Sequence, residues 1–322
     1  MPAGAVVASG VRAYFAPVDR TNVLPVPFDP AAMGRFAAGT VPAGWMDVGR
    51  LAEFRRGSSS PMTQVLSGAP AVVKMQVRAK AEAEVSCTFA GWSKVAMALS
   101  SGAQALNLLA VATGVNANAS GGGTVAAETV QPGSTATVLC MTGMTAVQAG
   151  DVVVVDIDYA GETGYVGSGA VGAYATGWSS GVPDVHWTRR VSFNVQRVLS
   201  VQSGVVTLAA PRMAGVPRVG MKLARVMGFV DREGGPWVPE WSGLFVVDGV
   251  QGDRVLWHYP RLQPAGASAA EVSAVLAAGP VAGGLERWRL SAQMRALPVV
   301  DANDGVSAVC FRSYLPAAMR LV

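Results

Sequence analysis

Polar and apolar residues alternate without a break between Val73 and Phe89. Throughout this stretch the odd positions are apolar or Ala, and the even positions are polar or charged. A period of two is typical of a β-strand with one buried and one solvent-facing side. Strands have about five or six residues on average, so the pattern predicts an unusually long strand, bent or folded into a hairpin near Ala79–Glu84. We expect its odd positions to be buried.

A second strict alternation lies near the C-terminus, between Arg287 and Ala296. One side of this predicted strand is polar and the other is apolar. The segment Asp301–Gly305 then predicts a hairpin turn into a further strand, because Asp, Asn and Gly favour tight turns. The polar side consists of Arg287, Arg289, Ser291, Gln293 and Arg295.

The segment Gly91–Ala110 is the best candidate for a helix, with Gly114 as its expected end. Between Val95 and Gly150 the only formal charge is Glu128. The apolar positions of the expected helix include Trp92, Val95, Leu99 and Leu106.

The chain divides into three parts by composition and pattern. Residues 1–44 are rich in Pro, Gly and Ala and predict an N-terminal arm. Residues 45–150 and 266–322 form the expected core, and residues 151–265 predict an inserted β subdomain made of short strand-like segments. The fold class is mostly β with one principal α-helix.

Composition narrows the function classes. Only 14% of the residues are charged, against about 25% in an average globular protein, which favours a surface buried by other subunits or by extensive packing. The net charge of +4 is too small to indicate nucleic-acid binding by itself. Three widely spaced cysteines favour a reducing compartment, and no signal peptide is recognisable, so we expect a soluble protein made inside the cell.

Two short motifs match a cofactor-binding and a catalytic signature, but neither is followed by the helix that the signature requires. Gly167–Gly172 ("GSGAVG") matches the dinucleotide-binding pattern, but the sequence that follows cannot form the helix that must hold the pyrophosphate. Gly177–Gly181 ("GWSSG") matches a nucleophile elbow with Ser179, and Asp248 and His258 complete the order Ser, Asp, His. Because Val182-Pro183 follows at once, no helix leaves the elbow. A serine hydrolase using Ser179 and His258 is therefore the alternative hypothesis.

Metal and cofactor sites are not expected. Two histidines, His186 and His258, cannot form a histidine-rich site, and the cysteines lack ligand spacing. Asp156, Asp158 and Glu162 have oxygen ligands suited to a hard cation, but a solvated acidic edge is the preferred interpretation.

Three segments together resemble the major tail (tail tube) proteins of tailed bacteriophages and related injection machines. The order matches: a short "DVG" lead strand, a long alternating strand, a helix and a C-terminal strand pair. The resemblance covers roughly residues 40–112 and 285–322, and it rests on pattern and order. Its segments are "GWMDVGRLAEFRR", "GAPAVVKMQVRAKAEAEVSCTFAGWSKVAMALSSG" and "LSAQMRALPVVDANDGVSAVCFRSYLPAAM".

The resemblance implies a structural virion protein without catalytic activity or cofactor. Six copies would form a ring, and stacked rings would form a tube whose lumen conducts DNA during ejection without reading its sequence. The implied partners are the protein itself and other tail proteins (tape measure, terminator and distal tail), assembled in the bacterial cytoplasm without membrane insertion. The fold would be a β-sandwich or barrel flanked by one α-helix, with the insertion on the outer wall of the tube. The nearly uncharged stretch would form an interface between rings or subunits, because interface cores are depleted in charge. Its candidate interface residues are Trp92, Val95, Leu99 and Leu106. Another phage structural or adhesion protein is a further alternative.

The resemblance also assigns a role to the polar sides of the two alternating segments. They would line the lumen or lie between subunits. Lumens in this family tend to be acidic, whereas these sides carry more basic than acidic residues, so either some of them pair across strands or one side points outward. The candidate residues are Lys74, Gln76, Arg78, Lys80, Glu82, Glu84, Arg287, Arg289, Gln293 and Arg295.

Overall fold

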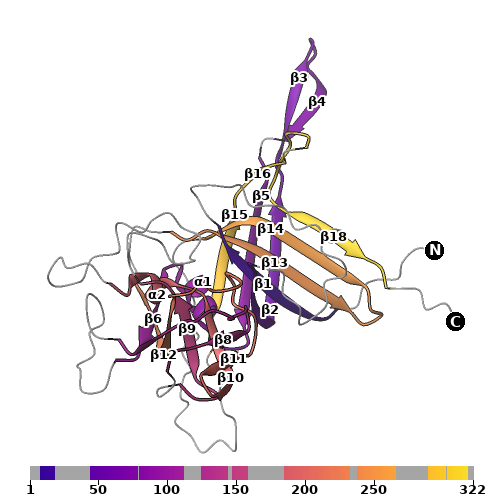
Figure 1. The fold of residues 1–322 in the computed structure, drawn as a ribbon. Helices are drawn as coiled ribbons and strands as arrows, with labels where there is room; N and C mark the ends of the chain where they lie inside the picture. Colours follow the sequence, from indigo (N-terminus) through magenta and orange to yellow (C-terminus); the bar gives the residue numbers. More distant parts are fainter. Residues whose placement is uncertain are drawn as a thin grey trace, which may run out of the picture.

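A computed structural model describes residues 8–18, 44–78, 80–111, 125–143, 147–158, 185–232, 238–265, 289–301 and 303–317 of the protein. The fold is mostly β, as the sequence predicts, and contains a closed six-stranded antiparallel barrel with few helices (Figure 1). In the described ranges, no helix is both long enough and apolar enough to cross a membrane.

The barrel joins strands from both ends of the chain. Its strand order is β13-β1-β2-β5-β15-β14, and pairing between β13 and β14 closes the ring. A further strand, β18 (Phe311–Leu315), pairs with β14 beside β15. The barrel strands are β1 (Ala8–Pro17), β2 (Met46–Ser59), β5 (Glu82–Phe89), β13 (Trp241–Gly249), β14 (Arg254–Pro264) and β15 (Ser291–Ala296).

A second sheet has its own core, around Val153, Val206 and Leu223. Its strand order is β6-β12-β9-β10-β11-β8, and β7 pairs with β12. Its strands are β6 (Gln104–Leu109), β7 (Ala127–Thr129), β8 (Val138–Cys140), β9 (Val152–Asp156), β10 (Val195–Gln202), β11 (Val205–Leu208) and β12 (Lys222–Arg232).

The bounds of this second sheet differ from the expected insertion of 151–265. The segments Trp241–Gly249 and Arg254–Pro264 are strands, as predicted, but they belong to the barrel. Conversely, β6, β7 and β8 lie before residue 151 and pair within the second sheet. Sheet membership depends on pairing between distant segments, which a local change in composition does not reveal.

The predicted helix is much shorter than expected. Helix α1 spans Lys94–Ser101, where the side chain of Ser93 caps its N-terminus and Gly102, with a φ of 62°, ends it. The residues after it form β6 instead. A second, short helix, α2 (Trp187–Val191), contacts β6. Leu106 and Leu109 are therefore buried on the two sides of a strand rather than on a helical stripe, and Leu108 is exposed.

The barrel interior forms the main core, together with α1 and α2. Phe15, Phe245 and Tyr259 fill the barrel, and Phe54 stacks on Phe245 at a centroid distance of 4.8 Å. Gly243 is required by this packing, because a Cβ at that position would lie 2.6 Å from Leu262 Cδ1.

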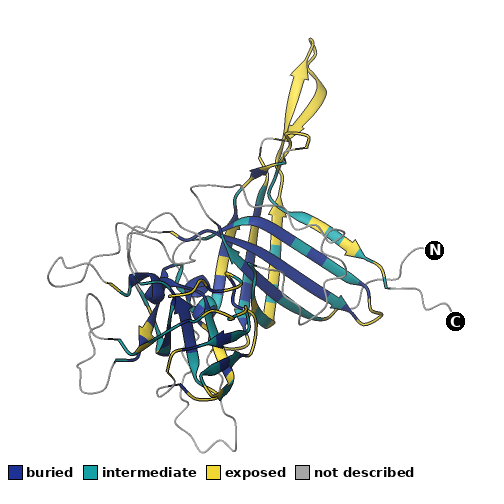
Figure 2. Cartoon of the chain, viewed as in Figure 1, coloured by how far each residue is buried: buried dark blue, intermediate teal, exposed yellow. Residues whose placement is uncertain are grey.

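The two halves of the barrel wall differ in what covers their outer side. On β1, β13 and β14, residues such as Tyr14, Leu244 and Leu256 point away from the interior core into a second buried cluster. On β2, β5 and β15 the outward residues are mostly exposed (Figure 2). One side of the barrel therefore presents a polar wall to solvent.

The long alternating segment folds into two strands with different environments. Strand β5 shows the predicted alternation, with Ala83, Val85, Cys87 and Phe89 buried. Strand β4 (Val72–Arg78) pairs with β3 (Met62–Ser67) instead, and both are exposed along their whole length. The prediction that Val73, Met75 and Val77 are buried is wrong, because no other layer of the described chain covers this hairpin (Figure 2).

The C-terminal alternation and its turn are confirmed. In β15 the residues Ala292, Met294 and Ala296 are buried, whereas Gln293 and Arg295 are exposed. Asp301–Gly305 forms the predicted turn, which joins the short strands β16 (Val299–Val300) and β17 (Ser307–Ala308). The carbonyl of Asp301 accepts a hydrogen bond from the Gly305 amide at 2.8 Å.

Candidate functional site

Outward residues of β2, β5 and β15 form one continuous surface, which we call the polar face. Opposed residues of neighbouring antiparallel strands lie on the same side of a sheet, so the pairing register places the outward residues in rows across the three strands. Its rows are Glu53–Thr88–Ser291, Arg55–Ser86–Gln293 and Gly57–Glu84–Arg295.

Two ion pairs offset part of the charge on the polar face. Arg295 Nη2 donates to Glu84 Oε1 across the strand pair at 3.1 Å. Lys80 Nζ donates to Glu82 Oε1 at 2.9 Å and lowers the pKa of that carboxyl. At the other end of the face, beyond the Ser86–Gln293 row, Thr88 Oγ1 and Ser291 Oγ lie 3.1 Å apart. The basic excess read from the sequence is thus partly cancelled by pairing across and along strands.

The structure divides the predicted polar residues among several places. Glu82, Glu84, Gln293 and Arg295 lie together on the polar face, with Lys80 at its margin. Arg289 is exposed just before β15, and Arg287 lies outside the described residues. Three further candidates lie on the β3–β4 hairpin, away from the barrel wall: Lys74, Gln76 and Arg78.

The hairpin of β3 and β4, residues 62–78, projects from the barrel beyond the ends of β2 and β5 (Figure 1); we call it the projecting arm. It continues the β2–β5 pair, since Ser59 pairs with Glu82 and Met62 with Arg78. All seven large apolar residues of its strands are more than one third exposed: Met62, Val65, Leu66, Val72, Val73, Met75 and Val77.

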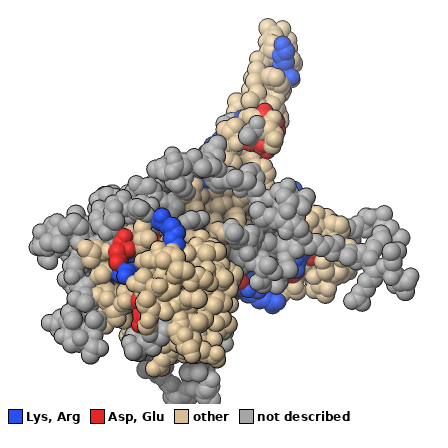
Figure 3. Space-filling view, viewed as in Figure 1, with Lys and Arg blue, Asp and Glu red and all other residues tan. Residues whose placement is uncertain are grey.

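Apolar residues lie on both sides of the projecting arm. Val65 pairs with Met75 and Leu66 pairs with Val73, and because Val65 and Leu66 are consecutive in the strand, the two pairs face opposite sides of the hairpin. The only formal charges in residues 62–78 are Lys74 and Arg78, and Figure 3 shows basic side chains on the arm and acidic ones at its base. Such an exposed apolar surface is unusual for a monomer and is typical of an interaction site.

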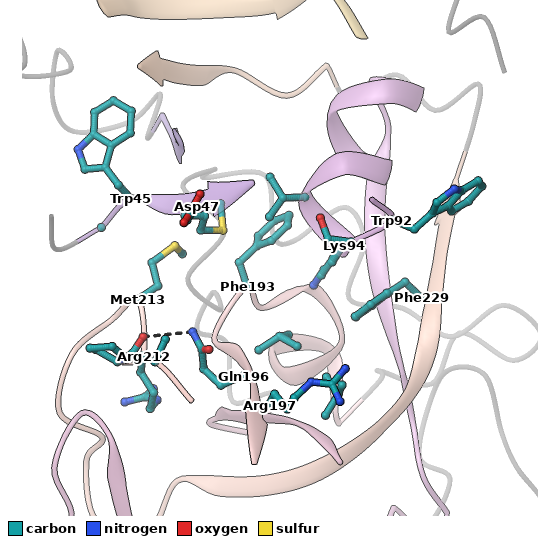
Figure 4. A pocket seen from close by; sticks show the side chains of 18 residues that line it. Trp45, Asp47, Trp92, Lys94, Phe193, Gln196, Arg197, Arg212, Met213 and Phe229 are labelled. Atoms are coloured by element: carbon teal, nitrogen blue, oxygen red, sulfur yellow. Dashed lines mark hydrogen bonds between the residues drawn. The ribbon is translucent and has the colours of Figure 1, made fainter. Parts of the chain in front are cut away.

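A cavity of about 560 Å³ lies where the start of β2, the N-terminus of α1 and the second sheet meet (Figure 4). Its size is within the usual range for binding pockets of roughly 300–1,000 Å³. Apolar walls dominate it, and they come from six separate parts of the chain: residues 44–47, 92–95, 152, 193–197, 210–213 and 229. The larger apolar side chains are Trp45, Met46, Trp92, Val95, Phe193, Met213 and Phe229.

Two polar side chains in the cavity, Lys94 and Gln196, donate hydrogen bonds to the protein's own backbone. Lys94 Nζ donates to the carbonyls of Val191 and Ser192 at 2.9 and 2.6 Å, and it lies 4.4 Å from the centre of the Phe193 ring. Burial lowers the pKa of Lys94 and Asp156 opposes that shift, while the carbonyl acceptors also favour the ammonium form. Gln196 Nε2 donates to the Pro211 carbonyl at 3.1 Å.

The predicted interface helix does not present its buried residues to other subunits. Leu99 and Leu106 are buried in the chain's own core, and Leu106 belongs to β6 rather than to the helix. Val95 packs partly against the same core. Trp92, just before α1, is half exposed at the cavity and is the one member of the set that is accessible.

The histidine of the alternative hydrolase hypothesis is buried in the barrel wall. His258 stacks against Phe311, and its Nε2 lies 2.9 Å from Ser242 Oγ. Burial lowers its pKa to about 4. Ser179 and the Gly167–Gly172 motif lie outside the described residues. The structure therefore pairs His258 with a different serine from the one that the sequence suggested.

The acidic residues expected at a solvated edge have structural partners instead. Asp156 is buried, and its Oδ2 accepts hydrogen bonds from Ser192 Oγ at 2.6 Å and Asn194 Nδ2 at 3.0 Å. Asp158 accepts a hydrogen bond from Arg189 Nε at 2.8 Å, and Glu162 lies outside the described residues. Among the residues that the structure describes, no group of His, Cys, Asp and Glu could hold a metal ion.

Sequence reasoning located part of the polar face but missed the two apolar features. The exposure of the projecting arm could not be predicted, because β4 has the same alternation of polar and apolar residues as a half-buried strand. The cavity has no local signal, because its walls come from residues 44–47, 92–95, 193–197 and 229, among others. No protein-family model matches the chain, and no curated protein sequence matches it significantly.

Proposed function

We propose that the protein is a structural subunit that associates with copies of itself into rings, which stack into a hollow tube. The observation that carries this proposal is the projecting arm, whose seven large apolar residues are exposed in the single chain. Burying apolar surface contributes roughly 25 cal/mol per Å², so covering the arm favours association. The resemblance to major tail proteins supplies the expected arrangement of six copies per ring.

The polar face is the surface best suited to line the lumen of such a tube. It spans three adjacent strands, is largely exposed, and has the small polar side chains Thr88, Ser86 and Ser291 to one side of the Arg295–Glu84 pair. Pairing with Glu84 and Glu82 offsets the charges of Arg295 and Lys80, which weakens contacts with DNA phosphates, because tight phosphate contacts need unpaired Lys or Arg. Such a surface lets DNA pass without sequence specificity.

The resemblance to tail tube proteins also implies a location and further partners for the protein. The protein would be a component of a virion tail, assembled in the bacterial cytoplasm, with the tape measure, terminator and distal tail proteins as its other partners. The second sheet suits the outer wall, since it is separate from the polar face and Figure 3 shows few charges over much of its surface.

Sedimentation velocity of the purified full-length protein and of one arm variant tests the proposal. We expect the wild type to sediment as large assemblies at high concentration. The double variant Val73→Asp/Met75→Asp should remain folded, because both sites are exposed, but should sediment as smaller species. Val250→Asp, at an exposed apolar position outside the arm, is the matched control and should assemble like the wild type. A wild type that stays monomeric at high concentration would overturn the proposal.

A further inference from the structure

We propose that the tip of the projecting arm of one copy inserts into the cavity of the next copy, in a head-to-tail contact that stacks the subunits. This inference rests on the self-association proposed above and adds the acceptor site. The arm tip is residues 66–73, and the acceptor is the cavity lined by Trp45, Trp92, Phe193, Met213 and Phe229, among others.

The arm and the cavity lie at opposite ends of the same strand. Met46 and Asp47, at the start of β2, line the cavity, and the arm follows Ser59 at its end. The fourteen residues of β2 span roughly 45 Å at about 3.3 Å per residue. Figure 1 likewise shows the arm pointing away from the second sheet, whose strands form part of the cavity. A chain therefore cannot fill its own cavity with its own arm, and the occupant that fits is the arm of a second copy.

A projecting element at one end and a receptor at the other define a heterologous interface. Such an interface does not close on itself in a dimer; repeated along an axis it builds an open-ended stack. The contact thus accounts for growth along the tube and is separate from whatever contacts close a ring.

The chemistry of the arm tip matches the cavity. The sequence from Leu66 to Val73 is uncharged and apolar except for Ser67. The larger apolar side chains dominate the cavity walls, and Lys94, Gln196 and Arg197 donate to carbonyls of their own chain. Lys74 follows the tip directly, where the half-exposed ring of Trp92 offers a cation a favourable aromatic face.

Complementation between two defective variants tests the inference. The arm variant, Leu66→Asp, keeps its cavity, and the cavity variant, Trp92→Glu, keeps its arm. Ala210→Trp, which fills the cavity from an exposed position, is a second cavity variant in case Trp92→Glu fails to fold. Each is purified separately, checked by circular dichroism, and measured alone and mixed by light scattering and negative-stain microscopy.

We expect each variant alone to lose stacking, and the mixture to form pairs of twice the mass and no longer stacks. Pairs form because the intact arm meets the intact cavity, and growth stops because the remaining arm and cavity are both defective. Cavity variants that stack like the wild type would overturn the inference and leave the proposed tube intact. A mixture that forms no pairs would also overturn it, since arms that dock on each other predict that result. A wild type that never assembles would overturn the proposed function itself.

Discussion

Arg295 Nη2 lies 3.1 Å from Glu84 Oε1 across the β15–β5 pair, and both side chains are about half exposed on the polar face. Exposed ion pairs contribute roughly 0–1 kcal/mol, so this pair adjusts the charge of the face more than the stability of the barrel. We therefore expect Arg295→Gln to lower the free energy of unfolding by less than about 1 kcal/mol in urea titrations. A loss of several kcal/mol would show that the pair is shielded from water.

The alternation in β5 predicts opposite outcomes at adjacent positions. Val85 points into the barrel core and Ser86 into the polar face. Val85→Asp places a carboxylate in the core and should cost at least about 3 kcal/mol or abolish folding. Ser86→Asp should fold and assemble normally. Equal unfolding midpoints for the two variants would contradict the assignment of the two sides.

The same substitution on the arm should behave differently. Val77 has the alternation of a buried residue, yet it is exposed. Val77→Asp should therefore change the free energy of unfolding by less than about 0.5 kcal/mol, while it weakens assembly. Urea titration measures the first effect and sedimentation velocity the second. A large loss of stability in the monomer would mean that the arm packs on its own chain.

Lys94 joins α1 to the end of α2 through carbonyl hydrogen bonds, and it is fully buried. Lys94→Met leaves those acceptors unpaired, and each unpaired buried polar group costs roughly 1–3 kcal/mol. We expect a loss of about 2–3 kcal/mol in thermal or urea unfolding. Lys80→Met, at an exposed lysine, is the matched control and should change stability little.

Acid should destabilise the protein through His258. Its pKa falls from the ordinary 6.5 to about 4 because burial disfavours the charged ring. The unfolded chain takes up a proton near pH 6.5 and the folded chain does not, so this contribution to stability is present above pH 6.5 and is lost as the pH falls toward 4. The loss reaches roughly 3 kcal/mol.

Urea unfolding of the wild type and of His258→Gln between pH 7 and 4 measures this contribution. The variant keeps a hydrogen-bonding group near Ser242 but has no titrating ring, so its stability should depend less on pH in this interval. Identical pH profiles for the two proteins would contradict the assignment.

The alternation of polar and apolar residues correctly predicted burial in strands that have one side in the core and one side in solvent. Val85 and Met294 are buried and Glu84 and Arg295 exposed, as period two requires, and the polar face brings these residues together. Pattern could not predict that Val73, with the same alternation, lacks a covering layer, because burial is a property of the neighbouring element. It also assigned the strand at Leu106 to a helix, since a strand buried on both sides has no periodicity.

The cavity and the limits of the second sheet were beyond sequence reasoning for a different reason. Both depend on which distant segments pair, such as β12 with β6 and β1 with β13. Ser179 lies outside the described residues, so its proposed catalytic role stays a prediction, whereas His258 contacts Ser242 and Phe311.

Whether the protein assembles into a hollow tube can be seen by negative-stain electron microscopy of the purified full-length protein at high concentration. We expect hollow rings with six-fold symmetry, seen end-on, and stacks of such rings that form tubes with an open channel. Particles that remain single subunits, or compact oligomers without a central channel, would contradict it.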